Sequence, residues 1–394
     1  MRRLLIPVAA LALIASGASA AFAAADPAVQ VPDQAKITIT GHGWGHGHGM
    51  SQYGAEGAAR AGKTADEIVS FYYPGTTLGE LKGYVKVWLT ADNDNDTVVL
   101  ARSGLNVRDL ATKQKWALPD NGATQWRLSV SPGGASIVAY KTDSWHRFVA
   151  LTGDGEFTAW GQPITLVTPG GSTAYRGALR SVRPSTTSTA RSTVNVLRID
   201  NYVRGVIPRE MPASWSPSAV QAQAIAARTY AAYEMKHPLS AGYQICDTTS
   251  CQVYGGYSAE DSRANAAVVA TAGQILTYDG EPAFTQFSSS NGGWSAAGSA
   301  PYLTAEQDPY DGWAGNPNHD WSIVIDASVV ERRFPRLGNL TAITISRDAT
   351  YDEGGRAGQV VLAGSNADVT VSGDTFRSVL GLKSTWFALT AAAK

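Results

Sequence analysis

The sequence predicts an α+β protein, and three observations carry that prediction. Between residues 82 and 169, short runs of alternating apolar and polar residues are separated by Gly, Pro, Asn and Asp, which is the spacing of strands and turns. Two helical segments with start signals follow, at 200–211 and 217–236. Residues 337–389 then alternate strands with one short helix near Phe376.

The elements before the strand-rich region have local signals of their own. A β-like run covers residues 36–40. Thr64 and Glu67 have the spacing of a capping box, which predicts a short helix that ends before Pro74.

The helices after the strand-rich region are predicted from caps and from composition. Asp200 is expected to cap the first, and Ser216 with Pro217 supplies an N-cap and a first-turn proline for the second. The second helix is alanine-rich, so a neighbouring element can approach it closely. The stripe of small side chains along one face of this helix consists of Val220, Ala224, Ala227 and Ala231.

A third helix and a hairpin are expected further along the chain. The helix covers residues 259–272, begins at a Ser258/Asp261 box and stops at Gly273. The hairpin turns at Asp279-Gly280.

The composition limits the class of partner. The chain has 394 residues, 32 Lys+Arg and 33 Asp+Glu, so its net charge of −1 offers no footprint for nucleic acid or an anionic membrane. Charged residues make up 16%, against roughly 25% in ordinary soluble domains, and there are 11 Trp and 16 Tyr. Such a chain suits uncharged or carbohydrate partners. Its length predicts two or three units at about 150 residues each.

The N-terminus has the three parts of a secretory signal. Two arginines precede an apolar run at 4–14, and small residues follow, so that cleavage fits at Ala20, Ala23 or Ala25. We therefore expect a signal peptide over residues 1–25 and a secreted protein. The alternative is an uncleaved anchor, although the run is short for a membrane-spanning helix.

Cys246 and Cys251 are the two cysteines of the chain. In an exported protein, this spacing indicates a small disulfide loop that shapes the backbone beside a working surface. A zinc site is the alternative, but it needs two further ligands and His237 is the single histidine nearby.

Two formal motifs fail on their context. "GAARAGKT" at 57–64 matches a phosphate-binding loop, yet the preceding residues look helical, where the motif requires a strand. "ADNDNDT" suggests a calcium loop that starts at Asp92, but an EF-hand needs Gly and Glu where Thr97 and Ser103 stand. We interpret it as an acidic turn between strands.

The segment "GHGWGHGHGMSQYGA" is the most distinctive pattern near the N-terminus. By residue type, His42, His46 and His48 could bind a metal, while the alternating glycines allow close backbone approach. The other interpretations are a tightly packed loop with hydrogen-bonded histidines and the lining of a ligand groove.

Glu210 is the best-framed candidate for acid catalysis. It lies between Pro208 and Pro212, and its apolar neighbours, Met211 among them, would raise the pKa of its carboxyl group. A general acid needs such a retained proton. Arg228, 18 residues further on, could orient a substrate or the acid. The alternative is an exposed glutamate at a helix end.

Several longer motifs occur along the chain. They are "GHGWGHGHGMSQYGA", "NYVRGVIPREMPASWSPSAVQAQAIAARTYAAYE", "CDTTSCQVYGG", "AFTQFSSSNGGWS", "YDGWAGNPNHDWS" and "FRSVLGLKSTWF". Together they resemble the stage II sporulation protein D family, also described as SpoIID/LytB or amidase-enhancer domains. The resemblance covers most of residues 175–387 and the segment 41–55.

The resemblance implies a domain organisation. It consists of an N-terminal segment at 26–80, a β-rich insertion at 81–170 and a SpoIID/LytB core of mixed sheets and short helices at 171–394. In many relatives the Gly/His element follows the "LGLxS" segment, so this chain resembles a circular permutation. Residues 41–55 are then expected beside residues 380–387 and near Glu210.

The resemblance also implies a function. Sporulation members of the family are lytic transglycosylases that cut peptidoglycan between N-acetylmuramic acid and N-acetylglucosamine, which gives 1,6-anhydro products without a cofactor. The catalytic glutamate of the family falls on Glu210, and an arginine that contacts substrate falls on Arg228. Zinc, held by some members near the Cys loop, is not expected because its histidines are not evident. The alternative function is a non-catalytic, wall-binding enhancer of an amidase.

An extended glycan groove is expected around Glu210, since aromatic faces pack on the C–H faces of sugars. Trp44, Tyr230 and Trp294 are aromatic candidates for it. The substrate-binding prediction comprises Arg228, Gln223, Trp215, Tyr254, Gln252, Ser289, Asn291, His46, Gln52 and Tyr53. Expected partners are peptidoglycan glycan strands and a wall amidase, without nucleic acid, a metal or stable membrane insertion. The expected location is extracellular and cell-wall associated.

Overall fold

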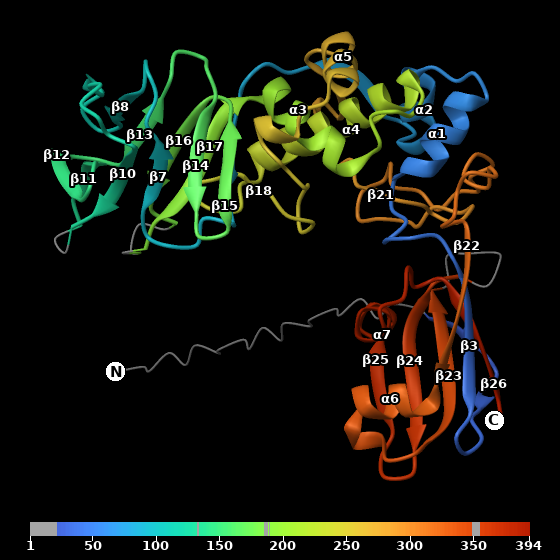
Figure 1. Ribbon diagram of the computed structural model, residues 1–394. Coiled ribbons are helices and arrows are strands. Elements are labelled where there is room, and N and C mark those ends of the chain that lie inside the picture. Colours follow the sequence, from blue (N-terminus) through green and yellow to red (C-terminus); the bar gives the residue numbers. More distant parts are fainter. Residues whose placement is uncertain (1–21, 132–133, 185–187, 189, 349–354) are drawn as a thin grey trace, which may run out of the picture. The chain divides into compact units, whose positions relative to one another are not determined.

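The structure is a computed structural model that describes residues 22–394 apart from 132–133, 185–187, 189 and 349–354. Contacts divide the chain into two compact units, seen in Figure 1. The larger is formed by residues 42–321, and the smaller by residues up to 41 together with 322–394. Both units contain helices and mainly antiparallel sheets, which confirms the predicted α+β class.

The larger unit contains two extensive sheets. One has the strand order β18 (Ile245–Cys246), β6 (Tyr84–Trp88), β17 (Ser192–Arg198), β16 (Ala178–Val182), β13 (Gly155–Thr158), β8 (Asn106–Asp109) and β9 (Lys115–Ala117). The other has the order β12 (Trp145–Leu151), β11 (Ser136–Lys141), β10 (Gln125–Val130), β7 (Thr97–Leu100), β14 (Ile164–Thr168) and β15 (Gly171–Tyr175). The strand-rich region is therefore observed where the sequence predicts it.

The β-rich region does not end at residue 170. Strands β14 and β15 form a hairpin in which Thr168 pairs with Gly171, and β6 pairs with β17. Because these pairings join strands on both sides of residue 170, the predicted border of an insertion falls inside a hairpin.

Two small sheets complete the larger unit. One has the order β20 (Glu281–Pro282), β19 (Gln274–Tyr278) and β5 (Thr77–Glu80), and the other pairs β21 (Phe287–Ser288) with β4 (Met50–Ser51) in parallel. Asp279 and Gly280 connect β19 to β20 with φ of +50° and +81°. Positive φ at both central residues is the geometry of a type I′ turn, so the predicted hairpin is confirmed.

A buried helix, α4 (Pro217–Lys236), organises the helical part of the larger unit. It contacts β19 and four helices, which are α1 (Gln52–Arg60), α2 (Ala65–Tyr72), α3 (Ile199–Glu210) and α5 (Ser262–Ala270). Figure 1 shows these helices gathered around α4. The predicted stripe is 2% exposed or less along its whole length. Helix α4 is therefore buried on nearly all sides, and its small side chains allow the neighbours to approach.

The caps of α2 and α4 show which local signals the fold uses. The capping box of α2 is confirmed, since Glu67 N donates to Thr64 Oγ1 and Thr64 N donates to Glu67 Oε2. Helix α4 begins at Pro217 as predicted, but the hydroxyl of Ser216 caps no helix N–H. Instead Ser216 N and Oγ donate to the buried carboxylate of Glu56, at 2.8 and 3.2 Å.

The predicted cap at Asp200 is wrong. Helix α3 begins at Ile199 with Arg198 as its N-cap residue, and the Asp200 carboxylate instead accepts a hydrogen bond from Arg228 Nε at 2.7 Å. The Arg228 side chain is completely buried, and it also donates to carbonyl oxygens of Ala224, Val268 and Gln274. The guanidinium group thus ties together α3, α4, α5 and β19, and the substrate contact predicted for Arg228 is corrected to a structural role.

The smaller unit is built from two sheets. One contains β1 (Phe22–Ala25), β23 (Leu340–Asp348), β24 (Ala357–Gly364) and β25 (Val369–Ser372), with β2 (Val29–Gln30) also on β23. The other has the order β22 (Asp320–Asp326), β3 (Lys36–His42) and β26 (Phe387–Ala392). Helices α6 (Ala327–Arg333) and α7 (Gly373–Leu380) accompany them. Gly41 pairs with Phe387, and the permutation itself stays a prediction.

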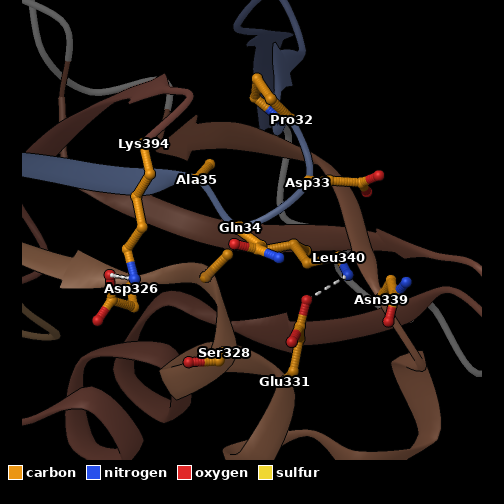
Figure 2. Close-up of a pocket in the computed structure, with 11 residues that line it drawn as sticks. Pro32, Asp33, Gln34, Ala35, Asp326, Ser328, Glu331, Asn339, Leu340 and Lys394 are labelled. Carbon is orange, nitrogen blue, oxygen red and sulfur yellow. Dashed lines mark hydrogen bonds and ion pairs between the residues drawn. The ribbon is translucent and has the colours of Figure 1, made fainter.

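A pocket of about 430 Å³ lies within the smaller unit (Figure 2). Two of its three carboxylates are already engaged, because Lys394 Nζ lies 3.1 Å from Asp326 and Glu331 accepts a hydrogen bond from Leu340 N. None of the residues predicted to bind substrate lines it.

Two sequence interpretations concern segments near the N-terminus. Residues 1–21 of the predicted signal peptide lie outside the described residues, and 22–25 form β1. Among the described helices, none combines the length and the apolar character needed to cross a membrane. Helix α1 precedes Lys63 where a phosphate-binding loop would require a strand.

Arg228→Met is expected to lower the free energy of unfolding by about 3 kcal/mol, because it leaves carbonyl groups unpaired and removes one partner of a largely buried ion pair. Arg263→Met is the matched control, since Arg263 pairs with Asp261 at the surface and its loss should cost less than about 1 kcal/mol. Urea denaturation of both variants measures the difference. Equal, small losses would contradict the structural role of Arg228.

Candidate functional site

Glu210 is the last residue of α3 and is half-buried. Its Oε1 accepts a hydrogen bond of 2.6 Å from the backbone N–H of Val253. Burial raises the pKa of Glu210, and the Val253 N–H opposes this only in part. The carboxyl end of α3 carries a partial negative charge, which also disfavours the ionised form. The carboxyl group is thus suited to retain a proton.

The Val253 amide is positioned by the loop that contains the two cysteines. Cys246 and Cys251 are joined by a disulfide bond, and Cys251 N donates to Thr248 O at 2.9 Å. The Asp247 carboxylate accepts hydrogen bonds from Thr90 N and Oγ1, the latter at 2.7 Å. These contacts close the loop on itself and tie it to Thr90, which follows β6, so covalent and polar constraints together hold the donor to Glu210.

The Gly/His segment contributes His46 to the site and packs on the chain at residues 288–290. Trp44 N donates to Ser290 O and Ser290 N to Trp44 O, at 2.8 and 3.1 Å, while Gly47 N donates to Ser288 Oγ. His48 N donates to His46 Nδ1 at 3.0 Å, and the two rings stack with centroids 5.0 Å apart. The backbone conformation explains the alternating glycines. A positive φ, which glycine adopts without steric cost, occurs at Gly43, Gly45, Gly47 and Gly49.

The buried carboxylate of Asp311 connects the Gly/His segment to neighbouring parts of the chain. It is completely buried and accepts hydrogen bonds from Ser51 Oγ at 2.5 Å, Ser290 Oγ at 2.8 Å and His319 Nδ1 at 2.9 Å. The hydrogen bond to Asp311 raises the pKa of His319. Asp311 therefore joins the Gly/His segment to the chain around residues 290–319.

These elements enclose a small pocket of about 210 Å³. Its lining consists of His46, Glu210, Tyr230, Thr249, Ser250, Cys251, Gln286 and Phe287. Three residues predicted for the groove, His46, Tyr230 and Glu210, thus line one pocket, although His46 and Glu210 are 164 positions apart. Glu210 is the single carboxylate among these eight residues. The volume is below the roughly 300–1,000 Å³ of pockets for drug-sized ligands, so it fits one part of a larger molecule.

Several polar residues predicted to bind substrate are buried and bonded to the protein itself. Gln52 Nε2 donates to Gln223 Oε1, and Gln252 accepts from Tyr202 and donates to the Ala227 carbonyl. Tyr254 Oη donates to Asn195, and Asn291 Nδ2 donates to the Asp308 carboxylate. All of these side chains are 7% exposed or less, so their predicted role is corrected. The residues concerned are Gln52, Gln223, Gln252, Tyr254 and Asn291.

The remaining candidates are partly accessible but lie outside the pocket lining. Tyr53 and Trp215 pack edge to face with centroids 4.8 Å apart, and Tyr53 also contacts Trp313. Ser289 is half-buried, and its carbonyl accepts from Tyr53 N. Trp44 is 48% exposed. Their roles as substrate contacts stay predictions.

Sequence reasoning missed the backbone donor Val253 and the pocket residues Gln286 and Phe287. The cysteine pair was a signal for the first, because a short loop constrains the residues that follow it. Asp311 lies in the motif "YDGWAGNPNHDWS". The spacing of residues in the sequence does not distinguish a buried, hydrogen-bonded aspartate from an exposed one.

With the geometry established, comparisons with known proteins place the chain. Residues 187–278 match the family model described as "Stage II sporulation protein" (SpoIID). This segment contains α3, α4 and Glu210, so the predicted resemblance is confirmed over these residues.

Curated proteins with related names are also similar to part of the chain. The chain is 40% identical over 137 residues to "Amidase enhancer" of Bacillus subtilis, over 33% of this chain and 18% of that protein. It is 32% identical over 144 residues to "Stage II sporulation protein D" of the same organism, over 31% and 42%. The protein of that name from Bacillus amyloliquefaciens is 30% identical over 175 residues, over 36% and 51%. The chain therefore spans about half the length of these relatives or less.

Gly43→Ala is expected to destabilise the fold more than Gly62→Ala. Both residues have positive φ, which costs an alanine about 1–2 kcal/mol. A Cβ on Gly43 would lie 2.7 Å from Ser290 O, whereas nothing lies within 4 Å at Gly62. Overpacking should add about 1–3 kcal/mol at Gly43 alone. Thermal and urea unfolding of the two variants test this, and equal losses would argue against the close packing of the Gly/His segment.

Proposed function

We propose that this protein is a peptidoglycan lytic transglycosylase that acts outside the cytoplasmic membrane, with Glu210 as its acid and base. The observation that carries the proposal is the Glu210 carboxyl group. It lines a pocket, is half-buried with a raised pKa, and is held by one backbone N–H. The SpoIID match and the names of the curated relatives support a role at the cell wall.

The reaction needs one group that first gives and then takes a proton. Protonated Glu210 donates to the oxygen between N-acetylmuramic acid and N-acetylglucosamine while the C1–O bond breaks. The muramoyl ring then carries oxocarbenium character. The Glu210 carboxylate removes the proton of the C6 hydroxyl, and that oxygen bonds to C1. The product is a 1,6-anhydro ring, and Glu210 is protonated again.

The pocket favours this route over hydrolysis. Hydrolases use a pair of carboxylates, set apart by a distance that depends on whether water or the enzyme attacks. Glu210 is the single carboxylate among the pocket-lining residues. An internal nucleophile, the C6 hydroxyl, removes the need for a second one.

The other pocket residues offer contacts for a sugar. Phe287 and Tyr230 present aromatic faces, while Gln286, Thr249 and Ser250 provide hydrogen-bonding groups. Because the pocket is small, we expect it to take one ring of the glycan, with the rest of the strand over neighbouring residues.

Glu210→Gln is expected to abolish release of 1,6-anhydro-muropeptides from purified peptidoglycan, because an amide N–H is far too weak an acid to protonate the glycosidic oxygen. Mass spectrometry of the soluble products measures release. Glu281→Gln is the matched control, since Glu281 is exposed and pairs with Lys236. Release by Glu210→Gln at the level of the unaltered protein would refute the mechanism.

In the unaltered protein, ionisation of Glu210 links the pH dependence of activity to the pH dependence of stability. Since the pKa of folded Glu210 lies above its ordinary value of 4.5, the folded state binds the extra proton, and stability falls as pH rises from 4.5 through the raised pKa. Activity should fall over the same limb as the acid ionises. At pH 7, Glu210→Gln should therefore melt at the same temperature as the unaltered protein or above it. A clearly lower melting temperature would show that the charged carboxylate stabilises the fold.

A second candidate function is enhancement of a wall amidase, favoured by the name of the 40%-identical relative. In that case the protein binds peptidoglycan and raises the rate of a purified amidase, but it releases no 1,6-anhydro products itself. Glu210→Gln would then enhance as well as the unaltered protein does, which separates the two functions in one experiment.

A further inference from the structure

The Val253 N–H that donates to Glu210 follows directly after Gln252, a residue whose predicted substrate contact is corrected above to a buried one. The Gln252 side chain is 1% exposed and lies outside the pocket lining. A primary amide removed from water is costly unless both its oxygen and its nitrogen form hydrogen bonds. The partners of Gln252 therefore show what this side chain does in the fold.

Both ends of the Gln252 amide are hydrogen-bonded, each to a different helix. Tyr202 Oη of α3 donates to Gln252 Oε1 at 3.1 Å, and Gln252 Nε2 donates to the Ala227 carbonyl of α4 at 3.3 Å. Tyr202 and Ala227 are completely buried. A buried polar network in which every member has a partner makes its surroundings rigid. Gln252 thus fixes the end of the disulfide loop to α3 and α4 together.

Covalent geometry transmits this constraint to Glu210. The N–H of Val253 belongs to the planar peptide group that begins at the Cα of Gln252. Fixing the Gln252 side chain at two points therefore limits how far that peptide group can rotate. The segment is also held further along, because Gly255 N donates to the Gly205 carbonyl of α3 at 3.0 Å.

The Val253 N–H affects both oxygens of the acid. It donates to Glu210 Oε1 at 2.6 Å. In a protonated carboxyl group the carbonyl oxygen is the better acceptor, so this contact favours Oε2 as the oxygen that carries the proton. In the ionised group, the same N–H stabilises the negative charge and opposes the rise in pKa that burial causes.

We propose that Gln252 is a positioning residue, which holds the Val253 N–H against Glu210 Oε1 by bridging α3 and α4. Tyr202 acts through Gln252, because its hydroxyl group reaches the amide oxygen and not the carboxyl group itself. The importance of this arrangement for catalysis rests on the proposed function of Glu210. The arrangement itself can be tested without substrate.

The elements packed around Glu210 bring other titratable groups. His46 of the Gly/His segment and Tyr230 of α4 line the same pocket, and Asp247 lies in the disulfide loop. Burial raises the pKa of Tyr202 in α3, and the charge of Glu210 adds to this. The pKa of Glu210 itself is shifted by burial and by its backbone donor. Loss of that donor should therefore appear as a further rise of this pKa.

The test measures the pKa of Glu210 by NMR in protein labelled with ¹³C at the glutamate carboxyl carbon, in the absence of peptidoglycan. The Glu210 signal is the one that Glu210→Gln lacks. Gln252→Met keeps the length of the side chain and removes both hydrogen bonds, so it should raise this pKa by about 0.5–1. Tyr202→Phe should raise it less, and the double variant should match Gln252→Met alone.

Gln223→Met is the matched control, because Gln223 is also a completely buried glutamine and its Oε1 accepts a hydrogen bond from Gln52 of α1. It should leave the pKa of Glu210 unchanged, even where urea unfolding shows a loss of stability. An unchanged pKa in folded Gln252→Met, or an equal rise in Gln223→Met, would overturn the proposal. Additive rises in the double variant would overturn the action of Tyr202 through Gln252.

Activity provides a second readout that separates this inference from the catalytic one. If Glu210 is the acid, Gln252→Met should release 1,6-anhydro-muropeptides at least about tenfold more slowly, because the acid is less well placed. The limb on which activity falls should move to higher pH with the pKa of Glu210. A raised pKa in Gln252→Met, when the unaltered protein releases no anhydro products, would support the positioning role and contradict the transglycosylase.

Discussion

Burial of α4 on all sides is the constraint on which the larger unit depends. A helix without an exposed face must be surrounded, and here α1, α2, α3, α5 and β19 surround it. Alanines along it permit close approach, and Arg228 near its centre donates to carbonyl groups of α5 and β19 as well as to one of α4 itself. The end of α3 is fixed against α4 in consequence, which sets Glu210 at one edge of the helical cluster with Tyr230 of α4 beside it.

The protein treats its inward-facing carboxylates in two ways. Asp311 and Glu56 are surrounded by donors and act as structural connections. At Asp109, backbone N–H groups outweigh the effect of burial and hold the pKa below its ordinary value. Glu210, by contrast, accepts a hydrogen bond from Val253 N and lines a pocket. This contrast distinguishes groups that stabilise the fold from groups available for chemistry or binding.

Local signals predicted the elements well, and long-range contacts decided their roles. The capping box at Thr64, the proline start of α4 and the Asp279-Gly280 turn depend on neighbours within four residues, so the sequence suffices for them. Asp200 has the right type for a cap, but a buried guanidinium 28 positions away takes its carboxylate. Polar residues of the family motifs likewise have the right type for ligand contacts. Many of them are instead buried and hydrogen-bonded to other elements of the protein.

By itself, the sequence determined the α+β class, the helix limits near Glu210 and the resemblance that singles out this residue. Periodicity, helix caps and the order of motifs depend on residues that are close together or in fixed order along the chain, so the sequence alone shows them. Only the tertiary structure shows that His46 lines the pocket with Glu210 and that Val253 N lies 2.6 Å from Glu210 Oε1. It also shows that Arg228 is buried in the core. Burial and distance depend on which segments pack together, and no spacing in one chain encodes that directly.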